Sequence, residues 1–395
     1  RGGQMPEISK TLQPVFTTNF ILVTIINLFV FFSFQMIFPT LPLYIKSLGG
    51  TDSVIGLVMG TFMITSLATR PFAGLALDKI GRKQVFIIGL VVLGLSAFAY
   101  SLAASVTMIV FIRLLHGFGW GIAGTATSTV AAEIIPRERF GEGMGYFSMA
   151  NSLSLAIAPA AGLYISHRYG FRDVFMLATV LVIIGLLLAL LIRYRKYHPQ
   201  NTLSRREALY EKSAFGPAVM VFFVSATFGG TSSFLPLYAY QRGVADIGVF
   251  FTVYALAVFV SRPLTGKMVD RYNYDVTIVP GLLSIAGAML IISYAHSLSE
   301  FLIAAVIYGF GFGTCQMSLQ TMVLKNVRRE RLGAANATFF SGVDVGMGLG
   351  ALTLGSFAEI WGYSDMFIIA SSGILLAFLV YVLYIRRHNI NTLPA

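Results

Sequence analysis

The segment TRPFAGLALDK at residues 69–79 recurs 192 positions later as SRPLTGKMVDR at residues 261–271, with Arg-Pro, Gly and Asp in the same places. Three other pairs keep this offset: GFGWG at 117–121 with GFGFG at 309–313, RERFG at 137–141 with RERLG at 329–333, and YGFRDVF at 169–175 with WGYSDMF at 361–367. An offset held over roughly a hundred residues indicates a duplication. The sequence therefore predicts two homologous halves that share one orientation.

The composition places the chain in a membrane. Hydrophobic residues make up 56% of the sequence and charged residues 11%, and the mean hydropathy is +0.77. A helix needs about 20 apolar residues to cross the hydrocarbon core. We predict such spans at residues 19–45, 54–77, 84–104, 107–132, 143–166, 172–194, 214–239, 246–269, 276–296, 300–325, 334–358 and 365–385. They are too long and too continuously apolar for barrel strands, so the predicted fold is all-α, with twelve transmembrane helices in two pseudo-symmetric six-helix bundles.

Polar stretches divide the chain into five predicted parts. A cytoplasmic N-terminal segment at 1–18 precedes the N-terminal bundle at 19–194, and the C-terminal bundle at 214–386 precedes a cytoplasmic tail at 387–395. Residues 195–213 are polar, basic and without apolar periodicity, which indicates a cytoplasmic linker. The first span has the length of a membrane helix, so we expect no cleavable signal peptide, and we interpret RGGQ ahead of Met5 as an added remnant.

The formal net charge of +11 reflects topology, because Lys and Arg gather on alternate loops. With the N-terminus in the cytoplasm, outside segments hold only Lys46, Arg168, Arg172 and Arg242. Cytoplasmic loops of membrane proteins are enriched in Lys and Arg, so we expect a multi-pass protein of the cell membrane with both termini in the cytoplasm. The expected surroundings are the lipid bilayer, with no nucleic-acid partner, and we expect a monomer.

The residues that carry chemistry argue against an enzyme. Cys315 is the only cysteine, so the chain can form neither an internal disulfide nor a thiolate metal site. The sequence has no metal-ligand cluster and no nucleophile with a base in register, and we expect no metal, no cofactor and no enzymatic activity. A membrane-embedded enzyme or receptor is the remote alternative.

The loop after the second span resembles the signature of the major facilitator superfamily, whose members are membrane transporters, through Arg70, Gly74, Asp78, Gly81, Arg82 and Lys83. The motifs FPTLPLY at 38–44 and RLLHGFGWG at 113–121 resemble the first and fourth helices of that superfamily's drug/proton antiporters. The fifth span resembles their helix-packing motif through Gly145, Ala158, Pro159 and Gly162. In that motif Ser154, Ala158 and Leu163 stand where the antiporters have glycines.

The resemblance implies a cytoplasmic gate that closes when the protein opens outward. In that state Asp78 accepts hydrogen bonds near Gly333, at the start of the span at 334–358, where the positive end of the helix dipole stabilises a carboxylate. Arg82 pairs with Asp78 and with Glu133. The expected gate residues are Arg70, Gly74, Asp78, Gly81, Arg82, Lys83 and Glu133.

Two qualifications apply to the gate. The basic residues of the loop can be read instead as topology signals alone, although such signals do not need an aspartate. The repeat at Asp270 and Arg271 lacks the GRK ending, so we expect a weaker second gate.

Charged residues inside the spans are costly and are therefore candidates for function. Asp344 lies about 16 Å into the span at 334–358, at 1.5 Å per residue, where removal from water favours its protonated form. It is the main candidate for proton coupling, and the alternative is a structural hydrogen bond. Arg113, which the resemblance turns toward the cavity, and His116 complete the proton-coupling set. Their alternatives are snorkelling and a neutral hydrogen bond.

The resemblance places a central cavity between the two bundles. Its candidate polar lining is Gln35, Arg113, His116, Asn151, Tyr254, Gln316, Gln320 and Asp344. Such a lining has few hydrogen-bond donors and is rich in Phe and Met, which suits amphipathic or lipophilic small molecules. We expect a secondary transporter that exports such substrates in exchange for protons by alternating access. The alternative is a symporter or uniporter for a small metabolite.

Overall fold

The computed structural model describes residues 14–50, 52–194, 209–244 and 247–385. The described chain contains twelve long helices. The N-terminal bundle consists of α1 (Thr18–Ser47), α2 (Asp52–Lys79), α3 (Arg82–Tyr100), α4 (Val106–Ile134), α5 (Phe140–Arg168) and α6 (Phe171–Leu191). The C-terminal bundle consists of α8 (Phe215–Gln241), α9 (Gly248–Arg271), α10 (Asp275–Tyr294), α11 (Leu298–Asn326), α12 (Leu332–Trp361) and α13 (Tyr363–Val380).

The prediction of an all-α membrane fold in two six-helix bundles is confirmed, and each predicted span overlaps one of these helices. In the described part of the chain, 11 helices are long and apolar enough to cross a membrane. The twelfth is α2, which carries Arg70 and Asp78 in its second half. Short helical turns complete the described chain: η1 (Arg137–Arg139), η2 (Lys212–Ala214), η3 (Arg329–Arg331) and η4 (Tyr381–Ile385).

Several predicted segments fall outside the described residues. These are most of the N-terminal segment (1–13), most of the linker (195–208) and the tail (387–395). Their predicted boundaries stay predictions.

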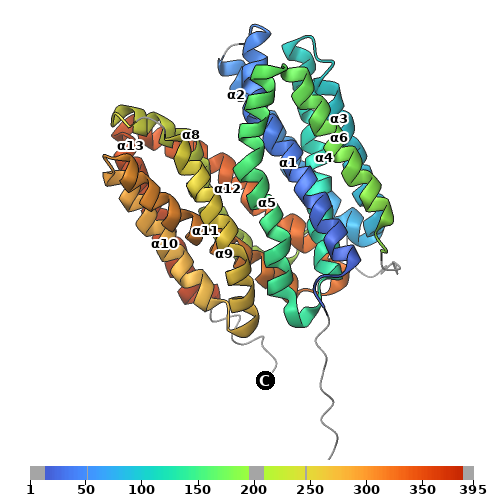
Figure 1. The fold of residues 1–395 in the computed structure, drawn as a ribbon. Coiled ribbons are helices and arrows are strands. Elements are labelled where there is room, and N and C mark those ends of the chain that lie inside the picture. Colours follow the sequence, from blue (N-terminus) through green and yellow to red (C-terminus); the bar gives the residue numbers. More distant parts are fainter. Residues whose placement is uncertain (1–13, 51, 195–208, 245–246, 386–395) are drawn as a thin grey trace, which may run out of the picture.

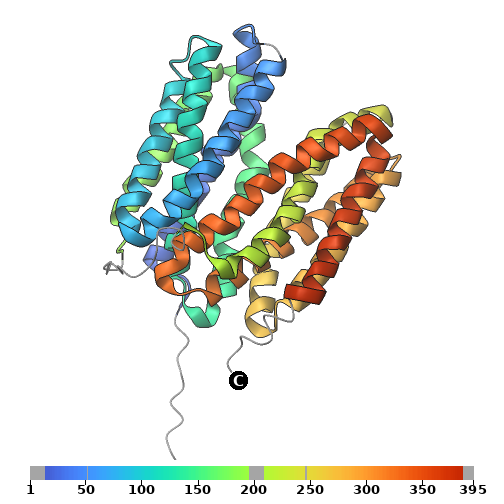
Figure 2. The same cartoon turned by 180° about the vertical axis from the view of Figure 1, so that it is seen from behind.

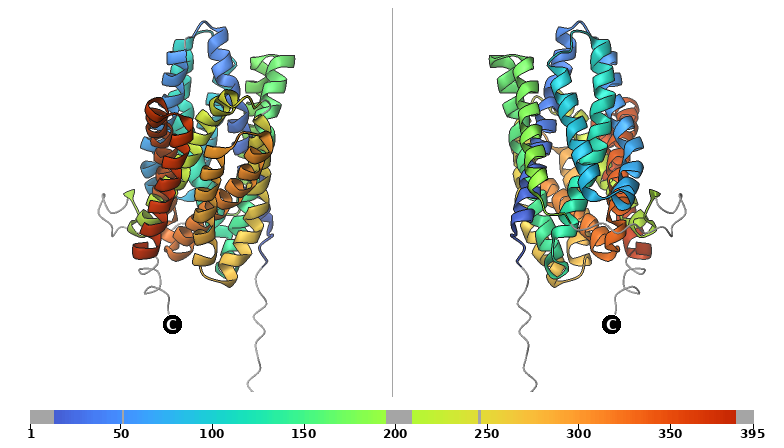
Figure 3. Two further views of the ribbon diagram at one scale, coloured as in Figure 1. Left: turned by 90° about the vertical axis from the view of Figure 1, so that its left-hand side faces the viewer. Right: turned by 90° about the vertical axis from the view of Figure 1, so that its right-hand side faces the viewer.

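The two bundles lie side by side, close together at one end and apart at the other (Figures 1 and 2). We call the end where they are close the latch end, and it holds Asp78 of α2 and Asp270 of α9. The opposite end, where the bundles diverge, is the open end, and it holds Leu102 and Tyr294. Most contacts between the bundles lie in two helix pairs, α2 with α12 and α5 with α9. The side views of Figure 3 show the helices of each bundle running between the two ends.

The internal repeat explains why these pairs are equivalent. Shifting α2 and α5 by 192 positions gives α9 and α12, so each pair joins one helix to the counterpart of its partner. Tight turns follow the same repeat. Gly170 and Gly362 start α6 and α13 with φ of +105° and +87°. Gly81, between α2 and α3, has φ of +120°, which a residue with a Cβ rarely adopts.

Candidate functional site

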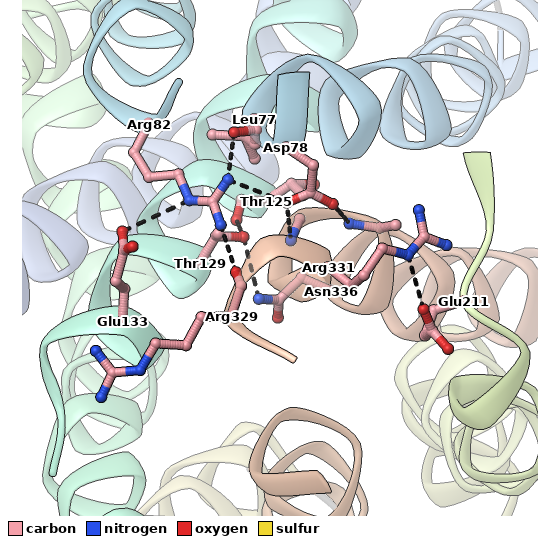
Figure 4. Close-up of polar contacts among 12 residues, drawn as sticks. Leu77, Asp78, Arg82, Thr125, Thr129, Glu133, Glu211, Arg329, Arg331 and Asn336 are labelled. Carbon is pink, nitrogen blue, oxygen red and sulfur yellow. Dashed lines mark hydrogen bonds and ion pairs between the residues drawn. The ribbon is translucent and has the colours of Figure 1, made fainter. Parts of the chain in front are cut away.

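The first latch joins Asp78 of α2 to the N-terminus of α12. The two carboxylate oxygens of Asp78 accept hydrogen bonds from Gly333 N at 2.9 Å and Ala334 N at 2.8 Å. These N–H groups have no partner within their helix, and the helix dipole adds to their attraction for a carboxylate. The contact expected from the sequence is therefore present, and Figure 4 shows Asp78 with its polar neighbours.

Arg82 connects this latch to a second helix of its own bundle. Its guanidinium donates to Asp78 Oδ1 at 3.1 Å and to the carbonyl of Arg329 at 2.6 Å, in the opposite bundle. It also donates to the carbonyl of Leu77, and its Nε lies 3.5 Å from Glu133 Oε2 (Figure 4). The side chains of Arg82 and Asp78 are 8% and 6% exposed, so the pair is largely shielded from water.

Close backbone contact accompanies the first latch. A Cβ at Gly74 would lie 2.6 Å from Gly333 O, and a Cβ at Gly333 would lie 2.5 Å from Gly74 O. Real Cβ atoms do not approach a carbonyl oxygen so closely, so both positions require glycine while the latch is closed. Of the other predicted gate residues, Gly81 starts α3 and Lys83 is exposed.

A second latch repeats the first on the other side of the interface. Asp270 of α9 accepts hydrogen bonds from Gly141 N at 2.9 Å and Glu142 N at 2.8 Å, at the N-terminus of α5. A Cβ at Gly266 would lie 2.5 Å from Gly141 O. Both aspartates thus make the same pair of bonds, and the expectation of a weaker second gate stays a prediction.

The cation of the second latch comes from a different position. Lys325, at the end of α11, lies 3.1 Å from Asp270 Oδ1. Its counterpart in the repeat is Glu133, so the charge at this position is reversed between the two halves. The loss of the GRK ending after Asp270 is thus compensated by a lysine from a neighbouring helix.

A polar seam lies between α4, α11 and α12. Asn336 Oδ1 accepts from Ser128 Oγ at 2.9 Å, and its Nδ2 donates to Thr129 Oγ1 at 3.1 Å. Gln320 Nε2 donates to Ser128 Oγ at 3.0 Å. Gln320, expected in the substrate cavity, therefore holds the two bundles together in this structure. These neutral groups separate at low cost where water can enter.

Asp344 lies deeper in the interface, in an ion pair that crosses it. Its carboxylate receives Nε and Nη2 of Arg70 at 2.6 and 3.0 Å, in the bidentate geometry that suits arginine, and Ser66 Oγ at 3.1 Å. Arg70 also lies over the ring of Phe340, 4.9 Å from its centroid. Arg70 and Asp344 are 4% and 15% exposed. The sequence singled out both residues but did not pair them.

Arg113 and His116 lie together inside the N-terminal bundle. Arg113 is 0% exposed, so it does not snorkel to the membrane surface. Its guanidinium stands over the ring of Phe62 at 4.3 Å and contacts His116 Nδ1 at 3.3 Å. Among the described residues it has no carboxylate partner within ion-pair distance. His116 also contacts the hydroxyl of Tyr100 at 3.3 Å.

Each bundle carries an aromatic quartet that the repeat relates to the other. The N-terminal quartet is Phe34, Phe62, His116 and Trp120, with Phe34 stacked on Trp120 at 4.2 Å. The C-terminal quartet is Phe228, Tyr254, Tyr308 and Phe312, with Phe228 stacked on Tyr254 at 5.6 Å. In each bundle the rings come from three helices, α1, α2 and α4 or α8, α9 and α11. Tyr254 was expected in the cavity, but the quartets as units were not.

The remaining residues predicted for the cavity and the helix-packing motif make contacts of their own. Asn151 accepts a hydrogen bond from Asn27 at 2.6 Å, between α1 and α5. Gln316 accepts from Arg262 at 2.7 Å, and Gln35 is half-buried in α1. In the helix-packing motif, a Cβ at Gly145 would lie 2.8 Å from Arg262 O and one at Gly162 2.6 Å from Met36 O. Ala158 is buried and Pro159 lies next to it within α5.

Two bundles of six long helices, related by a parallel repeat and joined by latches at one end, define a secondary transporter of the membrane. A sequence profile of the Major Facilitator Superfamily matches residues 23–245 and 217–394. The chain belongs to this superfamily, and it is a multi-pass membrane transporter.

The relatives extend over nearly the whole chain. The multidrug resistance protein MdtG of Enterobacter lignolyticus is 24% identical over 382 residues, which cover 92% of this chain and 91% of that protein. The multi-drug resistance efflux pump PmrA homolog of Lactococcus lactis is 24% identical over 385 residues, covering 92% and 94%. The crystal structure of the human organic anion transporter MFSD10 (TETRAN) has a similar fold, with a TM-score of 0.83 at 18% identity and coverage of 93% and 100%.

Proposed function

We propose that this transporter exports small amphipathic or lipophilic compounds across the cell membrane in exchange for protons. Relatives named as multidrug resistance proteins and efflux pumps support export. The basic residues of the α2–α3, α4–α5 and α11–α12 turns support a cytoplasmic position for the latch end and for both termini. The two halves, 19–194 and 214–386, then move as units.

The observation that carries the proposal is the Arg70–Asp344 ion pair. It joins α2 to α12, so it breaks whenever the bundles separate at the latch end. With that end in the cytoplasm, the ionised Asp344 holds the protein open to the outside. Protonation of Asp344 removes its charge, weakens the bidentate pair and lowers the cost of separation. Because of this ion pair, the change to the inward-open state depends on protonation of Asp344.

The direction of proton movement follows from this dependence. A proton taken up from outside neutralises Asp344 and permits the inward-open state, where the carboxyl faces cytoplasmic water and releases the proton. The ionised carboxylate then re-forms the pair with Arg70 as the protein returns outward with its substrate. Each cycle moves a proton in and a substrate out, which is antiport.

The substrate class follows from the aromatic quartets. The eight rings lie at matching positions of the two bundles, and four of them are phenylalanines without a hydrogen-bonding group. Offset and edge-to-face ring packing suits flat apolar groups and tolerates varied shapes. The proposed partners are therefore small molecules and protons, handled by a monomer without a nucleic-acid ligand.

The test measures transport in proteoliposomes with an imposed inward proton gradient. We compare counterflow of radiolabelled amphipathic compounds for wild type, Asp344→Asn and Asp365→Asn, with protein-free liposomes as the blank. Asp365 is exposed at the open end, at the start of α13, and serves as the matched control. We expect Asp344→Asn to keep exchange and lose its dependence on the gradient. Unchanged gradient dependence would eliminate Asp344 as the proton site.

The same measurement separates the alternatives. A symporter moves its substrate in the same direction as the proton, and a uniporter shows no dependence on the gradient in the wild type. Turnover of a membrane compound without any flux would indicate an enzyme or receptor.

A further inference from the structure

The repeat is broken at one buried arginine. Arg262 of α9 is the counterpart of Arg70, but the counterpart of Asp344 is Ser152. Arg262 is 4% exposed and donates to the neutral amide oxygen of Gln316 at 2.7 Å. Among the described residues no carboxylate lies within ion-pair distance of it. The interface thus has an arginine on each side and an acid on one side only.

Two buried polar atoms near this break have no partner. Arg262 Nε and Ser152 Oγ both lack a hydrogen bond among the described residues, and Ser152 is 2% exposed. On the other side, the equivalent Arg70 Nε donates to Asp344 Oδ2 at 2.6 Å. Buried arginine groups are seldom left without an acceptor, because desolvation of a charge is costly. Arg70 Nε therefore donates to a carboxylate, whereas the equivalent Arg262 Nε has none to donate to among the described residues.

We propose that Arg262 binds the carboxylate of an amphipathic, aromatic anionic substrate, in the way that Arg70 binds Asp344. This rests on the proposed function and names the chemical class that the transporter exports. The Gln316 amide and the Ser152 hydroxyl supply further donors, which suits a carboxylate with four acceptor sites.

The C-terminal quartet supplies the apolar half of the site. On α9, Tyr254 lies two turns from Arg262 on the same helix face, and on α11, Phe312 lies one turn from Gln316. At 1.5 Å per residue these separations are about 12 and 6 Å along the helices. A ring packed on the quartet therefore reaches Arg262 with a carboxylate attached directly or through a short chain.

The net charge of the residues buried in the helices favours an anionic substrate. Among described residues deep in the helices, Arg113 and Arg262 have no carboxylate partner, whereas Arg70 and Asp344 neutralise one another. An uncompensated positive interior repels cations and stabilises a bound anion. The proposal thus narrows the broad class of amphipathic compounds to organic acids.

The test uses ligands that share one skeleton. Biphenyl-4-carboxylate, the neutral biphenyl-4-carboxamide and the cationic biphenyl-4-methylamine are titrated into the full chain in detergent. Trp120, stacked on Phe34, reports binding by its fluorescence, with exposed Trp361 replaced by Phe in all samples. We expect the carboxylate to bind about tenfold more tightly than the amide, as a charge-assisted hydrogen bond implies, and the amine to bind most weakly.

Two variants assign this preference to Arg262. Arg262→Gln is expected to abolish the difference between carboxylate and amide, and Arg262→Lys to restore part of it through its charge. Ser152→Asp places a carboxylate where the repeat has Asp344, so it should pair with Arg262, raise the melting temperature and exclude the anionic ligand. Ser152→Asn adds similar volume without charge. An equal loss of preference in Ser152→Asn would contradict the charge argument.

Further outcomes distinguish this inference from the function on which it rests. Equal binding of the three ligands to the wild type, with proton-driven flux of the neutral amide, would overturn the anion site and leave the antiporter. A carboxylate preference without any proton-coupled flux would overturn the antiporter and leave the site. Loss of the preference in Arg113→Gln but not in Arg262→Gln would move the anion to the other bundle and refute the assignment.

Discussion

Replacing Asp270 by asparagine tests whether the two latches hold the bundles equally. Asp270 accepts Gly141 N at 2.9 Å and Glu142 N at 2.8 Å and lies 3.1 Å from Lys325 Nζ. Asparagine keeps one acceptor oxygen and turns a donor toward the second N–H group. The variant thus loses one hydrogen bond and the charge that Lys325 opposes, with little change in volume.

The expected magnitude follows from these contacts. A hydrogen bond to a charged group contributes about 1.5–3 kcal/mol, and in the separated state water satisfies the released groups. The closed latch should therefore lose about 2–3 kcal/mol relative to the separated state, which is a shift of about 30- to 150-fold at 1.4 kcal/mol per factor of ten. Asp78 makes the same two bonds with Arg82 as its cation, so Asp78→Asn should shift the equilibrium by a similar factor.

Distances between spin labels measure this equilibrium. One pair of cysteines replaces Leu102 and Tyr294, which are equivalent in the repeat, 56% and 67% exposed and at the open end. A second pair replaces Glu138 and Glu330, exposed in η1 and η3 at the latch end. Cys315→Ser removes the buried native thiol. Double electron–electron resonance should show the first distance shrinking and the second growing in Asp270→Asn.

The double variant Asp78→Asn with Asp270→Asn provides the internal control. Both substitutions act on one rigid-body equilibrium through groups that share no partner, so their effects should add. If Asp78→Asn shifts the distances and Asp270→Asn leaves them unchanged, the equivalence of the latches is wrong and the second gate is the weaker one. A change in only one of the two label pairs would contradict the rocking of whole bundles.

Three further predictions follow from single contacts. Gly333→Ala places a Cβ 2.5 Å from Gly74 O, so it should open the latch-end distance in the same assay, whereas Gly373→Ala, with nothing within 4 Å, should not. Phe34→Ala removes the ring stacked on Trp120 at 4.2 Å, so titrations should show affinity for neutral amphipathic ligands falling about two- to tenfold. Asn336→Ala removes the bonds to Ser128 and Thr129 across the seam, so hydrogen exchange at the start of α12 should become faster, and an unchanged rate would show that the seam carries no closing energy.

The helices were predictable from the sequence because they depend on local patterns, whereas the first latch was expected through the resemblance to the superfamily. Apolar length places the spans, and a helix N-terminus next to an aspartate has a physical reason to bind it. The second latch was predictable in principle. The repeat aligns Lys325 with Glu133, and this reversal of charge at the helix end offers Asp270 a cation where the GRK ending is missing.

The pairing of Asp344 with Arg70 was not predictable from the same patterns. It depends on how deeply α2 and α12 overlap, which is decided by the glycine contact between Gly74 and Gly333 one to three turns away. The depth of a residue along its helix can be counted from the sequence. The residue that faces it from another helix cannot be identified in this way. The aromatic quartets were missed for the same reason, since each is assembled from three helices.

The asymmetry between Arg70 and Arg262 separates the two ligands that an antiporter must couple. We propose that the proton acts at Asp344, in the α2–α12 pair, and that the anion binds at Arg262, near the α5–α9 pair, so the two do not compete for one group. Coupling must then pass through the equilibrium between open and closed latches, which both ligands bias. Linkage requires each to change the affinity for the other by the same factor. Protonation of Asp344 should therefore lower the affinity for the anion, and bound anion should lower the affinity of Asp344 for a proton by the same factor. Asp344→Asn should remove both effects.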